Sequence, residues 1–149
     1  MVYLVFRDEN VALADSFLHV LFVDDDDVDI KNVQREVEKL DFSLQLSIAK
    51  SGVEALNKLY GNHGEKKLTP TPQLILLDIN MPKMNGIEFL QKLRADPDFQ
   101  LITVYILTTA FTTKDKKATE SLNIAGHIIK PLQYEDLLKI YWSLVGDNF

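Results

Sequence analysis

Hydrophobic residues gather in five short runs along this chain, and more polar stretches with helical periodicity separate the runs. The runs cover residues 19–23, 44–49, 74–77, 104–107 and 128–129. Four of them are nearly all apolar and rich in β-branched residues, which is typical of parallel strands buried on both faces. Residues 44–49 alternate more regularly between apolar and polar positions, which predicts a strand with one more exposed face.

A helical pattern follows each predicted strand. Apolar residues recur at helical spacing between residues 30 and 40, and a capping box at residues 51–54 opens a second helix. Asn85 and Gly86 open a third helix, and a fourth with few apolar residues begins near residue 112. The fifth predicted helix carries on one stripe Tyr134, Leu137, Leu138, Tyr141 and Val145. Five strands that alternate with five helices predict an α/β fold with a doubly wound, five-stranded parallel sheet.

Acidic, hydroxyl-bearing or basic residues stand where four of the predicted strands end. Asp24 and Asp25 follow the first run, Asp78 follows the third, Thr109 the fourth and Lys130 the fifth. In an open parallel sheet the carboxyl ends of the strands lie along one edge, and ligands bind there. We therefore expect three carboxylates, a hydroxyl and an ammonium group to converge, which is a set suited to a divalent cation and a phosphoryl group.

Composition limits the class of protein. The chain has 149 residues, no cysteine and a net charge of −6. One domain at residues 18–149 accounts for this length, and residues 1–17 form an N-terminal extension of unknown role: a plain extension, an extra edge strand or an added leader. The acidic balance argues against nucleic acid as a partner, and no apolar run is long enough to span a membrane. The short apolar stretch at residues 2–6 does not fit a signal peptide, so we expect a soluble cytoplasmic domain.

Taken together, these residues resemble the receiver domain of two-component response regulators over about residues 18–146. The resemblance is carried by Asp24-Asp25, by residues 76–86 around Asp78, by Thr109-Ala110 and by Lys130-Pro131. It implies a flavodoxin-like (CheY-like) sheet with strand order 2-1-3-4-5. Since no further domain follows residue 149 in this sequence, the stand-alone type is expected, acting through protein contacts or onward phosphotransfer.

The resemblance also implies a metal site. Asp25, Asp78 and the backbone carbonyl of Asn80 would bind Mg²⁺ (or Mn²⁺), with Asp24 acting through a water molecule. The residues agree with this, because three neighbouring carboxylates raise each other's pKa, and a hard cation with oxygen ligands relieves that repulsion.

The implied chemistry is phosphoryl transfer from a sensor histidine kinase or a histidine phosphotransfer protein. Asp78 would be the phosphoacceptor and form an aspartyl phosphate, while Lys130 and the metal stabilise charge on the phosphoryl oxygens. Thr109 would hydrogen-bond the attached phosphoryl group and act as a switch. Such a protein assists its own phosphorylation and dephosphorylation but is not a turnover enzyme.

Two features concern the response to phosphorylation. His127 stands three residues before Lys130, where the family usually has an aromatic residue that turns inward on phosphorylation. This departure puts in question whether phosphorylation is coupled to such a residue here. Ile140, Trp142 and Leu144 are apolar but fall off the predicted core stripe of the last helix. Clustered exposed apolar residues usually mark an interface, so the last two helices and strand are a candidate surface for a homodimer or an unknown downstream target.

Each motif alone has an ordinary structural explanation. The acidic run at residues 24–27 suits the start of any helix, Asp78 suits a turn, and Lys130 suits a plain strand exit. Gly86 is either required beside the nucleophile or merely permissive in a turn. Two other functions also remain open: a phosphatase-like hydrolase with an aspartyl-phosphate intermediate, and a receiver-like binding module that needs no phosphorylation.

Overall fold

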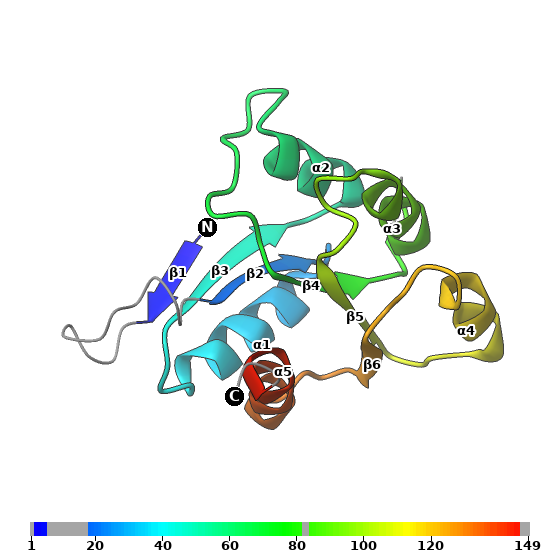
Figure 1. Ribbon diagram of the computed structural model, residues 1–149. Coiled ribbons are helices and arrows are strands. Elements are labelled where there is room, and N and C mark those ends of the chain that lie inside the picture. The colour runs from blue at the N-terminus through cyan, green and yellow to red at the C-terminus, as the bar shows by residue number, and fades with distance from the viewer. Residues whose placement is uncertain (1, 6–17, 82–83, 147–149) are drawn as a thin grey trace.

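A computed structural model describes residues 2–5, 18–81 and 84–146, and its central sheet has the predicted order. The parallel strands are β2 (Leu18–Val23), β3 (Leu44–Ala49), β4 (Leu74–Asp78), β5 (Thr103–Thr108) and β6 (Gly126–Ile129). The helices are α1 (Asp27–Glu38), α2 (Gly52–Tyr60), α3 (Gly86–Ala95), α4 (Thr113–Thr119) and α5 (Tyr134–Gly146). The strands run β3-β2-β4-β5-β6 across the sheet, which confirms the flavodoxin-like order 2-1-3-4-5 (Figure 1).

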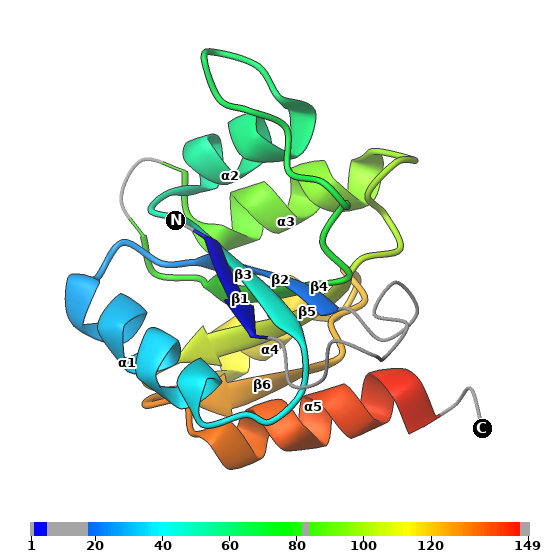
Figure 2. The same ribbon diagram turned by 90° about the vertical axis from the view of Figure 1, so that its left-hand side faces the viewer.

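A sixth strand adds to this fold at one edge. β1 (Val2–Val5) pairs antiparallel with β3 and extends the sheet beyond the five parallel strands (Figure 2). Of the three readings of residues 1–17, the extra edge strand is therefore the one that residues 2–5 adopt. Residues 6–17 lie outside the described part of the chain.

Helices cover both faces of the sheet, and the alternation of side chains along each strand fills two cores. α2 and α3 lie on one face, and α1 and α5 on the other (Figure 1). In β2, Phe22 belongs to the core beneath α1 and α5, while Leu21 belongs to the core beneath α2 and α3; neither side chain is exposed. Burial of a side chain of this size contributes about 1.5–3 kcal/mol, which explains why the strands read as continuous apolar runs. Among the described residues, no helix is long and apolar enough to cross a membrane.

The core-facing side of α5 differs from the predicted stripe. Ile140 is 3% exposed and belongs to the core, so it is not available for a surface interface, whereas Leu144 is partly buried and packs against the same core. The reason is that α5 contacts more than the sheet: Tyr141 stacks on Phe42, with ring centroids 4.0 Å apart. The helix therefore buries a wider apolar face than one stripe. Trp142 remains 61% exposed, as expected from the sequence.

His19 is a buried polar residue at the amino-terminal end of β2. Its Nδ1 lies 2.5 Å from the carbonyl oxygen of Pro70, and its Nε2 lies 2.7 Å from Oγ of Ser47. Since a carbonyl only accepts, Nδ1 carries the hydrogen, and the Ser47 hydroxyl can donate to Nε2. The neutral ring thus ties β2, β3 and the loop before β4 together. Burial lowers the pKa of His19, although the hydrogen bond to Pro70 opposes that shift.

This buried ring makes stability depend on pH. Above pH 6.5 the unfolded and folded chains both hold His19 neutral, and below that value the unfolded chain takes up a proton that the folded one resists. We expect the free energy of unfolding to lose a His19 contribution of about 1 kcal/mol between pH 7.5 and 5.5. Urea unfolding of the parent and of His19→Gln at both pH values measures it. The difference in free energy of unfolding between the parent and His19→Gln should be smaller at pH 5.5 than at pH 7.5. The control His63→Asn changes a residue in an exposed loop and should lose as much free energy of unfolding as the parent does between the two pH values.

Candidate functional site

The carboxyl ends of four parallel strands meet around one open cavity of about 470 Å³. Its lining residues come from the turn after β2, the first turn of α1 and the ends of β4, β5 and β6. They are Asp25, Asp26, Asp29, Asp78, Asn80, Thr109, Lys130 and Pro131. Residues that are up to about a hundred positions apart in sequence thus share one surface, because parallel strands present their carboxyl ends to the same side.

Three carboxylates form the acidic part of the site. Asp24, Asp25 and Asp78 each offer an oxygen, and these oxygens lie within 4.8 Å of one another. Asp24 is fully buried and Asp78 is 4% exposed, whereas Asp25 faces solvent. The turn after β2 holds Asp24 in place, since its carboxylate accepts a hydrogen bond from the backbone N–H of Asp26, and Asp26 is the N-cap of α1.

Burial gives these carboxylates an unfavourable environment. It raises the pKa of Asp24 to about 7, against the opposing effects of the Asp26 backbone N–H and of Lys130. Burial also raises the pKa of Asp78, while the N–H of Asn80, which donates to Oδ1 over 3.0 Å, opposes that shift. Oδ2 of Asp24 is buried and accepts no hydrogen bond from the described residues, although the Lys130 ammonium is near. A buried carboxylate oxygen needs positive charge beside it, which Lys130 supplies from 3.0 Å and a bound cation would increase.

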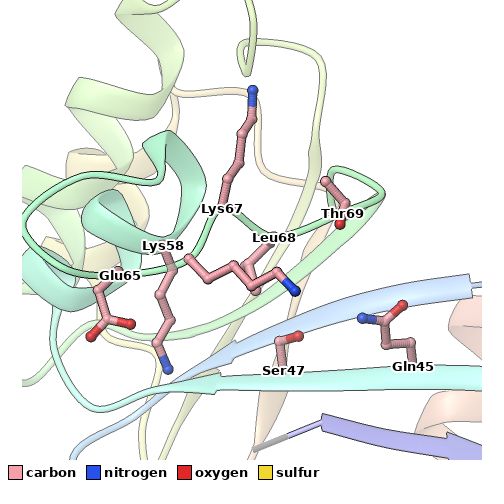
Figure 3. A pocket seen from close by; sticks show the side chains of 8 residues that line it. Gln45, Ser47, Lys58, Glu65, Lys67, Leu68 and Thr69 are labelled. Atoms are coloured by element: carbon pink, nitrogen blue, oxygen red, sulfur yellow. The ribbon is translucent and has the colours of Figure 1, made fainter.

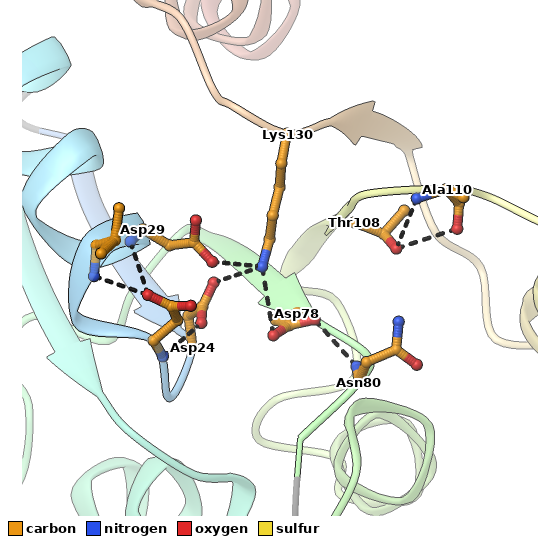
Figure 4. A network of polar contacts seen from close by, with 9 residues as sticks. Asp24, Asp29, Asp78, Asn80, Thr108, Ala110 and Lys130 are labelled. Carbon is orange, nitrogen blue, oxygen red and sulfur yellow. Dashed lines mark hydrogen bonds and ion pairs between the residues drawn. The ribbon is translucent and has the colours of Figure 1, made fainter.

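Lys130 supplies the only positive charge among the described lining residues. Its Nζ lies 2.7 Å from Asp29, 3.0 Å from Asp24 and 3.4 Å from Asp78 (Figure 4). Burial disfavours the charged ammonium, but the hydrogen bonds and charges of the aspartates outweigh it and raise the pKa of Lys130. Because of these aspartates Lys130 remains ionised, although its side chain is only 12% exposed. The peptide bond between Lys130 and Pro131 is cis.

The loop after Asp78 folds back tightly against the strand. A Cβ on Gly86 would lie 2.5 Å from the carbonyl oxygen of Asp78 and 2.5 Å from Cα of Ile79, both of which are backbone atoms. Gly86 is therefore required by close approach to the strand that carries Asp78, which settles the alternative left open from the sequence. Pro82 and Lys83, which also belong to the family-like stretch, lie outside the described residues.

The two threonines at the end of β5 have different positions. Thr108 is buried, and its hydroxyl donates to the carbonyl of Ala110 and accepts from the N–H of the same residue (Figure 4). This local turn leaves Thr109 exposed on the cavity wall. The sequence-predicted Thr109, and not its neighbour, is thus the hydroxyl that lies in the site.

A second cavity, of about 270 Å³, lies between β3, α2 and the loop after α2, and its charged lining residues are three lysines and one glutamate. Lys58 donates to the carbonyl of Ile48 over 2.7 Å and pairs with Glu54 over 3.0 Å. The Lys67 side chain extends away from the cavity floor formed by Ser47 (Figure 3). The functional candidate is therefore the cavity at the strand ends.

Comparison with known proteins shows the family of this chain. The family model of the response regulator receiver domain matches residues 20–141. This chain belongs to that family. Receiver domains are modules of two-component signalling, in which response regulators interact with histidine kinases or phosphotransfer proteins.

Individual proteins agree with the family match. The response regulator Rcp1 of Synechocystis sp. is 33% identical to this receiver over 121 residues, covering 81% of this chain and 82% of Rcp1. The crystal structure of a two-component response regulator from Legionella pneumophila is 52% identical with a TM-score of 0.80, covering 87% of this chain and 98% of that one. The Mn²⁺-bound form of Rcp1 superposes with a TM-score of 0.67 at 28% identity, over 87% of this chain and 92% of that one.

In this receiver the residues at the strand ends fit a hard divalent cation. Carboxylate and carbonyl oxygens are the ligands that Mg²⁺ and Mn²⁺ prefer, and Asp24, Asp25 and Asp78 supply three carboxylates within reach of one ion. The raised pKa values of Asp24 and Asp78, caused chiefly by burial, agree with this fit, because a bound cation would stabilise both ionised groups.

His127 lies apart from the acidic residues of this receiver. It is exposed on β6, and its ring stacks on Phe111, with centroids 4.2 Å apart and an interplanar angle of 13°. Phe111 in turn packs against the core beneath α2 and α3. His127 is thus a flat ring in an outward position, held by a second ring.

Asp29 is the residue of the site that the sequence reasoning missed. It lines the cavity and makes the shortest ion pair of Lys130. No local pattern indicated this role, because α1 begins at Asp27 and helical spacing therefore does not relate Asp29 to Asp25. The sequence interpretation of a helix-start acidic run covers residues 24–27, which includes the N-cap Asp26 but does not extend to Asp29.

Proposed function

We propose that this receiver accepts a phosphoryl group on Asp78 from a histidine kinase or a histidine phosphotransfer protein, and that phosphorylation alters its protein contacts. The observation that carries the proposal is the position of Lys130, whose ammonium lies 3.4 Å from Asp78 at the edge of an open cavity. A buried carboxylate with an adjacent fixed cation is the arrangement that phosphoryl transfer needs, because the reaction depends on positioning and charge stabilisation.

Asp78, Lys130 and Thr109 have different roles in this reaction. A carboxylate oxygen of Asp78 attacks phosphorus and forms an O–P bond while the P–N bond to the donor histidine breaks, and the leaving nitrogen regains a proton from solvent. The ammonium of Lys130 donates to a phosphoryl oxygen. The Thr109 hydroxyl, which also lines the cavity, donates to another phosphoryl oxygen once the group is attached.

Asp25, Asp78 and the backbone carbonyl of Asn80 would hold Mg²⁺ or Mn²⁺, and Asp24 would reach the ion through a water molecule. When bound, the cation supplies positive charge that offsets both the clustered carboxylates and the incoming phosphoryl oxygens. Support comes from the three carboxylate oxygens within 4.8 Å of one another and from the Mn²⁺-bound form of Rcp1.

The test is incubation with a small phosphodonor, such as phosphoramidate, with and without Mg²⁺, followed by intact-mass measurement. We expect a gain of one phosphoryl group per chain that requires Mg²⁺ and is removed by hydroxylamine, as an acyl phosphate would be. No gain, with an active control receiver in parallel, would favour a phosphorylation-independent binding module. Repeated turnover of a phosphate ester would favour a hydrolase.

The proposed output is a change in protein contacts on the α4-β6-α5 surface. Ile129 and Trp142 are 50% and 61% exposed there, which supports a contact with a second copy or with a downstream target. We propose that His127 takes the place of the family's aromatic switch residue, moving from its stack on Phe111 when Thr109 binds the phosphoryl group.

A further inference from the structure

The shortest contact of Lys130 is directed away from the proposed phosphoacceptor. Its Nζ lies 2.7 Å from Asp29 on α1, against 3.4 Å from Asp78 at the end of β4 (Figure 4). A lysine ammonium has three N–H donors, and three carboxylates surround it here. A phosphoryl oxygen that needs one of these donors must therefore displace a carboxylate.

Exposure indicates which carboxylate leaves. The side chain of Asp24 is not exposed and that of Asp78 is 6% exposed, whereas that of Asp29 is 24% exposed. A buried carboxylate that loses its cation bears the full cost of desolvation, while a partly exposed one is rehydrated. Asp29 is thus the partner that Lys130 can release most readily.

The local structure keeps Asp29 charged and in place. It stands in the first turn of α1, where a negative charge interacts favourably with the helix dipole. Its backbone N–H donates to the side chain of Asp26, the N-cap. The carboxylate is therefore presented to Lys130 by the same turn that carries Asp24 and Asp25.

We propose that Asp29 is a positioning residue that holds Lys130 in the unphosphorylated protein and competes with the phosphoryl group for it, which slows phosphoryl acceptance. This inference rests on the proposed function, since it concerns how fast Asp78 is modified. The ion pair between Asp29 on α1 and Lys130 at the end of β6 then limits the rate at which this protein takes up a phosphoryl group.

Asp29→Asn tests the proposal, because it removes the charge and keeps the shape. At saturating Mg²⁺ we expect the initial rate of phosphoryl gain from phosphoramidate to rise about two- to fivefold, the upper part of the range for one partly exposed ion pair. The affinity for beryllium trifluoride, a phosphoryl mimic, should rise by a similar factor. Mg²⁺ itself should bind more weakly, since Lys130 then turns towards the remaining carboxylates.

Two further variants separate charge from structure. Asp27→Asn removes an equal charge from the same helical turn, but Asp27 pairs with Lys50 outside the cavity, over 2.8 Å. It should leave the rate of phosphoryl gain within about 1.5-fold of the parent, a change too small to be an ion-pair effect at the site. Asp29→Glu restores a carboxylate and should return the rate towards the parent value. Equal rates for the parent and Asp29→Asn, or a slower rate for Asp29→Asn, would overturn the proposal.

The side-chain ammonium resonance of Lys130, assigned by its loss in Lys130→Arg, gives a readout that needs no phosphorylation. Its chemical shift should change in Asp29→Asn and remain that of the parent in Asp27→Asn. If the parent takes up no phosphoryl group, the proposed function fails, and an unchanged resonance in Asp29→Asn would show that the ion pair is also wrong. If the parent is phosphorylated and the resonance does not shift, only the role of Asp29 is refuted.

Discussion

Asp78→Asn is expected to take up no phosphoryl group, and in the absence of Mg²⁺ to unfold at a higher urea concentration than the parent protein. The first effect is complete, because an amide offers no carboxylate oxygen for attack on phosphorus. The second follows from the position of Asp78, which is buried close to Asp24 and Asp25. Neutralising one of three crowded carboxylates removes both repulsion and desolvation, against the loss of one ion pair with Lys130.

The gain in stability has a defined pH dependence. Burial raises the pKa of Asp78 in the folded protein above its ordinary value, so the folded chain binds more protons than the unfolded one once the pH exceeds about 4. The free energy of unfolding of the parent therefore falls as the pH rises through this range, and asparagine abolishes that contribution. The advantage of the variant should grow with pH and reach about 1–2 kcal/mol at pH 7.5.

Urea unfolding at pH 5 and pH 7.5, with and without Mg²⁺, measures this prediction. Adding Mg²⁺ should stabilise the parent strongly and the variant little. The difference between their urea midpoints should therefore become smaller or change sign. Asp98→Asn, which changes an exposed carboxylate outside the cavity, should alter neither the midpoint nor the response to Mg²⁺. A less stable Asp78→Asn variant at pH 7.5 would contradict the account of the crowded site.

Arg94→Met should cause the largest loss of stability of any variant considered, about 3 kcal/mol, because one side chain holds two loops. The guanidinium of Arg94 donates to the backbone carbonyls of Gln100 and Ile102 in the loop before β5. It also donates to the carbonyls of Leu122 and Asn123 in the loop before β6. Each such bond to a charged donor contributes about 1.5–3 kcal/mol, and water can replace only part of the loss at the more exposed carbonyls.

Thermal unfolding should show this as a fall in melting temperature of about 10 °C, and hydrogen exchange should increase chiefly in the loops at 96–102 and 119–125. Arg94→Lys should recover little, since a lysine lacks the planar fork that serves four acceptors in different directions. Lys92→Met removes an exposed positive charge from the same helix and is the matched control. Equal melting temperatures for Arg94→Met and Lys92→Met would show that the loops do not depend on the guanidinium.

The sequence determined the parts of this protein that depend on local periodicity and on the ends of strands. Runs such as residues 74–77 read as buried strands because both faces of a parallel strand are covered, and the order of strands and helices then limited the topology. The polar residues at the strand ends were found in the same way, because parallel connections bring every carboxyl end to one edge. Asp25, Asp78, Thr109 and Lys130 could therefore be grouped in one site without coordinates.

Only the tertiary structure decided which groups pair across the molecule. Asp29 and Lys130 are 101 residues apart, and no local pattern specifies that α1 turns this carboxylate towards the end of β6. The same holds for the carbonyls that bind Arg94, for Ile140 in the core and for the strand at residues 2–5. Periodicity identifies the face of an element, but the partner of that face is set by the packing angle and register of elements far apart in the chain.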